Sequence, residues 1–207
     1  MSRVAVAVLL LAGVANARPA RHRADNMPRG FQWPPSRTMR EAAAACEAKL
    51  DELGVAWKSA KREGRMVDPI ALADTALGGI DYVPVHDKQL PAMDCQLVLA
   101  LAQVAPKLYE LGVREVHVAA GKTKDLLSRH ALGLAMDIVS FVDDNGREAV
   151  VAKDYKAGDE LLLSIERALD DNPAFRTVLT PANDPISHAD HFHVEANPDY
   201  TDDRPSS

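Results

Sequence analysis

The sequence has few aromatic residues, no excess of positive charge and no long hydrophobic run. Aromatic side chains make up 5% of its 207 residues, which leaves few platforms for stacking nucleic-acid bases. Acidic residues outnumber basic ones by 30 to 24, so the net charge is −6 and no basic stripe is expected. The longest apolar run, residues 4–14, falls short of the roughly 20 residues that a membrane-spanning helix needs. We therefore expect neither nucleic-acid binding nor a stable membrane span.

The N-terminal segment is typical of a secretory signal peptide. Residues 1–3 are a short basic start before the apolar run, and Ala15 and Ala17 are the small residues that a signal peptidase reads. We predict that residues 1–17 are cleaved off and that the protein is periplasmic or secreted. An uncleaved N-terminal anchor is the alternative.

Cysteine is scarce, with two residues in the whole chain. Cys46 and Cys95 are too far apart in sequence to form a redox CxxC motif, and an oxidising compartment favours their pairing as a disulfide. Closing a loop of about 50 residues would contribute roughly 3 to 4 kcal/mol in the chain-entropy model. Two unpaired buried thiols are the alternative.

Beyond the signal peptide, the chain has the length and the 47% hydrophobic content of one globular domain. Residues 18–36 are rich in Arg, Pro and Ala, and we expect them to form an extended arm. The domain is expected to span residues 37–197, and residues 198–207 are expected to form a polar tail. Thr38 and Glu41 have the spacing of a capping box at the start of a first helix. Asp94 is a candidate N-cap for a second helix, which Pro106 should kink. Helices are predicted at 38–53, 95–111 and 160–170, and strands at 115–119, 136–142, 148–152, 175–179 and 192–195. The pattern predicts an α+β fold with a central, mostly antiparallel sheet and flanking helices.

Histidines are the chemically informative residues, and three of the seven fall within six positions. A catalytic zinc site takes three nitrogen or oxygen ligands and keeps one open position. Residues two apart on a strand point to the same face, so His191 and His193 should face one site. Asp137 opens the strand at 136–142, and Gly133 and Ala135 leave room for the chain to turn before it.

These residues form two motifs, Ser-x-His-x-x-Gly-x-Ala-x-Asp at 128–137 and His-Ala-Asp-His-Phe-His at 188–193. Together they resemble the LAS metallopeptidases, which include D-Ala-D-Ala carboxypeptidases and penicillin-insensitive murein endopeptidases. Within that group the chain is most similar to the bacterial extensin-like C-terminal domain family. The resemblance implies a LAS-like fold, Zn²⁺ held by His130, Asp137 and His193, and His191 as general base or transition-state stabiliser. It also implies that His188 is a further active-site histidine.

Several roles stay open at the level of sequence. His191 is the preferred general base, and Glu195, on the same strand face, is the second candidate. Ser128 either supports a ligand or is a turn residue, and Asp190 either orients a histidine or caps the loop. The remaining histidines, His22, His86 and His117, are interpreted as ordinary surface or core residues.

The resemblance implies a secreted zinc peptidase that hydrolyses peptidoglycan stem peptides or cross-links, of D,D or L,D type, with metal-activated water. The chain departs from the family just before the first motif, where only Lys122 or Lys124 offers positive charge for a substrate carboxylate. Lysine is a point charge rather than a bidentate fork. A non-catalytic, zinc-containing cell-wall binding or scaffold protein is therefore the second hypothesis, and a zinc-sequestering module the third. The sequence predicts no particular oligomeric state.

Overall fold

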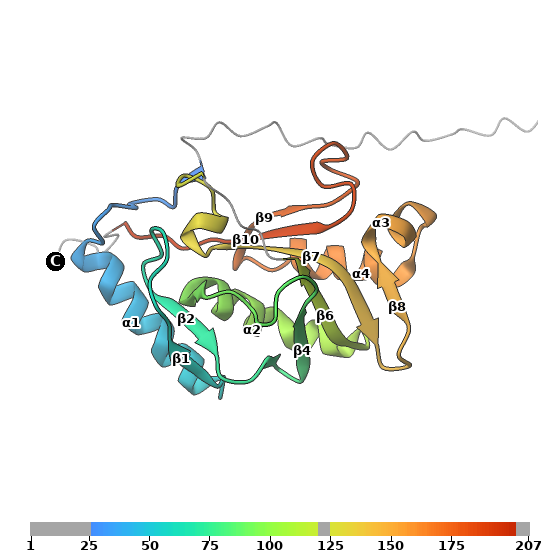
Figure 1. Ribbon diagram of the computed structural model, residues 1–207, viewed down its shortest axis with the longest axis horizontal. Coiled ribbons are helices and arrows are strands. Elements are labelled where there is room, and N and C mark those ends of the chain that lie inside the picture. The colour runs from blue at the N-terminus through green and yellow to red at the C-terminus, as the bar shows by residue number, and fades with distance from the viewer. Residues whose placement is uncertain (1–25, 120–124, 202–207) are drawn as a thin grey trace, which may run out of the picture.

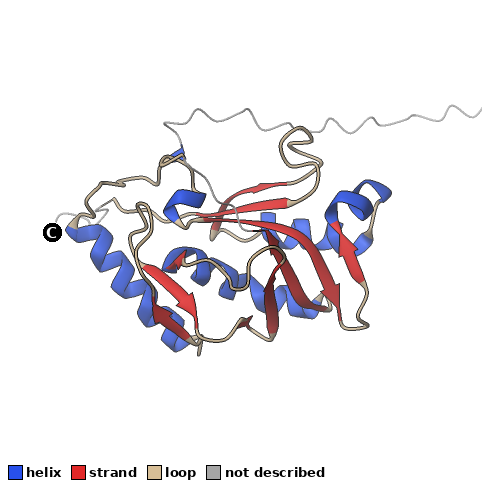
Figure 2. Cartoon of the chain, in the orientation of Figure 1, coloured by secondary structure: helices blue, strands red, loops and turns tan. Residues whose placement is uncertain are grey.

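The computed structural model describes residues 26–119 and 125–201, which form an α+β fold around a central sheet (Figures 1 and 2). The spatial order of the main sheet is β3-β4-β6-β7-β10-β9, and β8 pairs with the second half of β7. Among these strands β4 and β6 are parallel and the other neighbours antiparallel. Their bounds are Ala76–Leu77 (β3), Ile80–Pro84 (β4), Val113–Ala119 (β6), Ala135–Asp143 (β7), Glu148–Val150 (β8), Phe175–Leu179 (β9) and Phe192–Ala196 (β10).

A smaller, three-stranded sheet lies beside the main one. It consists of β1 (Trp57–Ser59), β2 (Pro69–Leu72) and β5 (Met93–Asp94), in the order β1-β2-β5 and with antiparallel pairing. Strand β5 leads directly into the second helix.

The helices are α1 (Arg37–Glu52), α2 (Cys95–Glu110), the short α3 (Val151–Asp154) and α4 (Glu160–Asp170). Helix α2 packs against α1, α4, β6 and β10, so it is the central support of the sheet. Its apolar residues Leu97, Leu101, Val104 and Leu108 are buried. The helix continues across Pro106 for another four residues.

Two local predictions differ from the structure. The N-cap of α1 is Ser36 rather than Thr38, because the Ser36 hydroxyl accepts a hydrogen bond from the Met39 amide at 3.2 Å. The strand predicted at 148–152 ends at Val150, where the chain turns into α3 and the Asp154 carboxylate accepts from the Val150 amide at 2.8 Å. β-Branched residues at 150 and 151 favour a longer strand, and this local side-chain contact overrides that preference.

The predicted disulfide between Cys46 and Cys95 is present and joins α1 to the first residue of α2. Both residues are buried, with exposed fractions of 2% and 0%, so the bridge lies inside the main core. It ties the outer helix α1 to the helix that supports the sheet.

Both ends of the described chain lie against the domain. The Asn26 carbonyl accepts hydrogen bonds from the Arg129 and Arg176 side chains, and the ring of Phe31 lies 6.5 Å from that of Tyr200. Tyr200, which the sequence places in the polar tail, is buried with Met39. The signal segment 1–17 lies outside the described residues. Within the described ranges no helix has both the length and the apolarity to cross a membrane.

Candidate metal centre

Neighbouring strands bring the two motifs together in the middle of the main sheet. His193 on β10 is the direct cross-strand partner of Asp137 on β7. Burial alternates along the first half of β7, where Met136 and Ile138 are buried and Asp137 is half-buried. Because successive side chains of a strand point to opposite faces, Asp137 points away from the core face that Met136 and Ile138 occupy. It lies beside its cross-strand partner His193.

A tight turn delivers His130 to the same place. His130 begins a short 3-10 helix, His130–Leu132, and the Ser128 hydroxyl accepts a hydrogen bond from the His130 amide at 3.3 Å. Ser128 thus acts as a turn residue that holds the backbone of a candidate ligand. Gly133 ends the helix with φ of +68°, and the chain then enters β7 two residues before Asp137.

Gly133 is required at this turn for two reasons. A left-handed backbone costs a residue with a side chain about 1–2 kcal/mol, and a Cβ here would lie 2.6 Å from the Asp94 amide nitrogen. We expect Gly133→Ala to lower the free energy of unfolding by more than about 2 kcal/mol, measured by urea denaturation. Gly146→Ala is the matched control, because Gly146 has φ of +79° and an added Cβ there would meet nothing within 4 Å. Equal losses in the two variants would contradict the steric argument.

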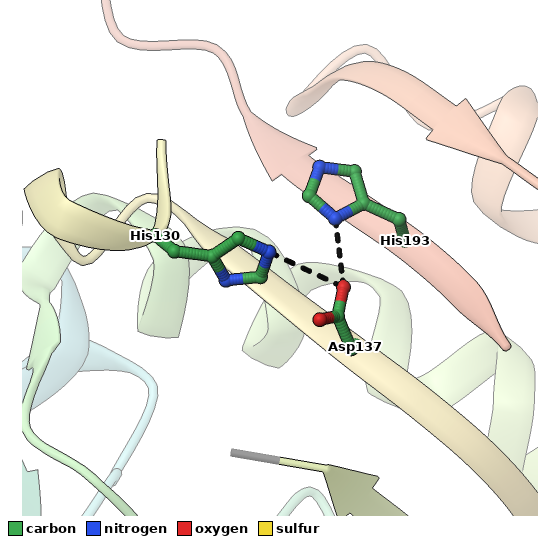
Figure 3. A group of neighbouring side chains, drawn as sticks. All are labelled: His130, Asp137 and His193. Carbon is green, nitrogen blue, oxygen red and sulfur yellow. Dashed lines mark hydrogen bonds and ion pairs between the residues drawn. The ribbon is translucent and has the colours of Figure 1, made fainter. Parts of the chain in front are cut away.

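The three candidate ligands converge on one carboxylate oxygen (Figure 3). Asp137 Oδ1 lies 2.8 Å from His193 Nδ1 and 3.3 Å from His130 Nε2. One ligand atom from each residue falls within 4.8 Å of the others. Ligand atoms about 2.0–2.1 Å from a tetrahedral zinc lie roughly 3.3 Å apart, so this spacing and this donor set fit zinc.

Mutual contact shifts the pKa of these groups. Burial raises the pKa of Asp137, but hydrogen bonds from His130 and His193 outweigh it and hold that pKa well below its usual range. Burial disfavours the charged form of His193, but the carboxylates of Asp137 and Glu195 outweigh it and raise the pKa to about 9. Asp137 therefore stays ionised, and two carboxylates face His193.

Two further histidines border this group. His191 immediately precedes β10, and its Nε2 lies 3.6 Å from Asp137 Oδ1 while its Nδ1 lies 2.7 Å from Asp190. The ring of His188 lies 4.9 Å from that of His191 and 5.2 Å from that of His193, and its Nδ1 contacts Asp184. Burial and the neighbouring His193 charge lower the pKa of His188. All four histidines of the two motifs are thus gathered at one place.

Glu195 lies behind the site rather than beside the ligand nitrogens. Its carboxylate is 3.2 Å from His193 Nε2, the ring nitrogen opposite the one that faces Asp137, and 3.5 Å from Arg176 Nη1. Burial raises the pKa of Glu195, but the His193 contact and the nearby arginine charges lower it overall. Sequence reasoning missed Arg176, because its proximity depends on the register of β9 against β10.

The group does not include His86 or His117. Lys122, Lys124 and His22 fall outside the described residues. His117 contacts Ser140 on the far half of β7 and Glu148 on β8, and His86 is exposed on a loop.

The model of the family described as "Extensin-like protein C-terminus" matches residues 44–202, about three quarters of the chain. The chain belongs to this extensin-like family. The match contains both motifs, with all three candidate ligands and the two bordering histidines. No curated protein and no solved structure matches the chain.

Proposed function

We propose that this extensin-like domain is a zinc-dependent peptidase that acts on peptidoglycan peptides. The observation that carries the proposal is the convergence of His130 Nε2 and His193 Nδ1 on one oxygen of Asp137, with His191 beside them. Two imidazoles and one carboxylate are a donor set typical of catalytic zinc, which leaves one position open. Bound zinc would polarise an amide carbonyl and activate water.

His191 is the residue best placed to move a proton. Its Nδ1 contacts the Asp190 carboxylate, which leaves Nε2 facing the centre. A carboxylate on one ring nitrogen holds the imidazole in the tautomer and orientation that let the other nitrogen accept a proton. His188, beside His191 and half-buried, would keep a fourth imidazole within reach of the substrate.

Glu195 has the position of a supporting group. Metal-binding histidines commonly place their second ring nitrogen against a carboxylate, which fixes the tautomer and the ring orientation. Glu195 occupies that position on His193, and it is anchored in turn by Arg176. We therefore assign proton transfer to His191 and orientation of His193 to Glu195.

The choice of peptidoglycan rests on the predicted export signal and on the motif resemblance to murein peptidases. Purified protein loaded with zinc should release shortened stem peptides from muropeptides, detected by mass spectrometry, and a chelator should stop the release. Elemental analysis should find about one zinc per chain. Muropeptide binding without any cleavage would instead favour a cell-wall binding or scaffold role, and readily exchanged zinc without peptide binding would favour a sequestering module.

Zinc affinity should depend on pH through His193. Below its pKa of about 9 the free site holds a proton on His193, which must leave before Nδ1 can bind a metal. Raising the pH therefore raises the apparent affinity, by about tenfold per unit between pH 6 and pH 8 for one proton. Asp137 adds no slope there, because its pKa is far lower. Competition with a chromogenic chelator measures the effect, and a flat profile would contradict it.

A further inference from the structure

A cavity of about 310 Å³ opens next to the candidate metal centre, on the side of His130. It is built from segments that are distant in sequence: the loop at 63–66, the approach to β5, the end of β6, and the turn that carries His130. Three of its lining residues are methionines, at positions 66, 93 and 136, and they are joined by Val118, Leu126 and Ala131. Because His130 lines the cavity as well, the cavity borders one of the three candidate ligands.

The lining is apolar, with one acidic exception. Among the described residues that line the cavity, Glu63 is the acidic one and no lysine or arginine takes part. Leu126, which lines the cavity, keeps 51% of its surface exposed. Apolar side chains favour an aliphatic group, and the Glu63 carboxylate disfavours an anionic one.

We propose that this cavity binds a neutral aliphatic side chain of the peptide substrate, next to the amide bond held at the His130, Asp137 and His193 centre. The proposal rests on the proposed peptidase function, which it extends from reaction to side-chain preference. The cavity is near the lower end of ligand-pocket volumes, about 300–1,000 Å³, which suits one side chain of several carbons. Methionines suit such a role, because their unbranched chains adapt to the shape of a ligand.

The methionines also provide the test. We would label the methyl groups of the full-length His191→Ala variant with ¹³C and add acetylated, amidated alanine peptides that carry norleucine, lysine or glutamate at the central position. Norleucine peptide should shift the NMR signals of Met66, Met93 and Met136. The signal of Met39, buried in a separate cluster, should stay in place. Glutamate peptide should bind at least about tenfold more weakly.

Two neighbouring leucines supply a matched pair of variants. Leu126 lines the cavity, and Leu127, 41% exposed in the same turn, does not. Leu126→Asp should weaken norleucine-peptide binding at least about tenfold, and Leu127→Asp should leave it unchanged. Equal losses, or shifts at Met39 as large as those at the three lining methionines, would overturn the proposal. Tighter binding of the lysine peptide than of the norleucine peptide would also overturn it, in favour of recognition through Glu63.

The two proposals fail in different ways. Methyl shifts report side-chain binding whether or not any bond is hydrolysed. Shifts without cleavage by the wild-type protein would count against the peptidase and leave the cavity assignment standing. Equal cleavage rates for peptides that carry norleucine, lysine or glutamate, at whichever position, would count against the cavity assignment and leave the peptidase proposal standing.

Discussion

Replacing His193 with alanine is expected to abolish both zinc binding and peptide hydrolysis. His193 supplies one of three candidate ligand atoms, and its Nδ1 lies 2.8 Å from Asp137. Removing a partner outside the ligand shell already costs about 10–100-fold in metal affinity or activity, so loss of a ligand should cost roughly 10³-fold or more. Zinc content after dialysis and the rate of muropeptide cleavage measure the two effects.

His191→Ala should separate binding from chemistry. If His191 moves the proton and binds no metal, zinc content stays near that of the wild type while the cleavage rate falls about 10²–10⁴-fold. His86→Ala is the control, because His86 is exposed, lies on a loop and belongs to neither motif. Loss of zinc from His191→Ala would show that His191 is a ligand and would overturn the assignment of roles.

Glu195→Gln distinguishes a supporting group from a general base. The amide keeps the size of the carboxylate but removes the charge that faces His193 Nε2 at 3.2 Å. We expect zinc affinity to fall about 10–100-fold, and saturating zinc to restore most of the cleavage rate. A cleavage rate that stays low at full zinc occupancy would identify Glu195 as the base instead.

Removal of the disulfide has the largest expected effect on stability. Cys46 and Cys95 are 49 residues apart, so without the bridge the unfolded chain gains the freedom of a long loop. In the chain-entropy model, replacing both cysteines with alanine should lower the free energy of unfolding by about 3–4 kcal/mol. Urea denaturation monitored by circular dichroism measures the change.

Reduction of the wild-type protein provides the matched control for this variant. The reduced wild type keeps both sulfur atoms in the core. It should therefore lose the stabilisation that comes from closing the loop, with little loss of packing. Similar midpoints for the reduced wild type and the double variant would assign the effect to the cross-link. An unchanged midpoint on reduction would contradict the prediction.

Local chemistry explains which elements were predictable. The apolar spacing of α2 and its Asp94 cap depend on residues within a turn or two of each other. The cap of α1 is harder to place, because Ser36 and Thr38 are both good capping residues. Which one is used depends on how the preceding chain approaches the helix.

The part of the candidate site that could be predicted is the part that depends on residue spacing within each motif. The His-x-His spacing places His191 and His193 on one side of a strand, and the distance from His130 to Asp137 allows a turn between them. The position of Glu195 relative to His193 also follows from the period of two. Its pairing with Arg176 does not, because that contact joins two strands whose register sequence alone leaves open.

The sequence by itself determined the ligand types, their spacing within each motif, the apolar helix faces and the pair of cysteines available for a bridge, because each depends on residues near one another or on composition. Only the tertiary structure decided that His193 pairs with Asp137 across β10 and β7, that Glu195 lies on the opposite ring nitrogen, and that three methionines meet beside His130. These contacts depend on strand register and on the packing of distant segments, which are set by the burial of the whole core rather than by any local pattern.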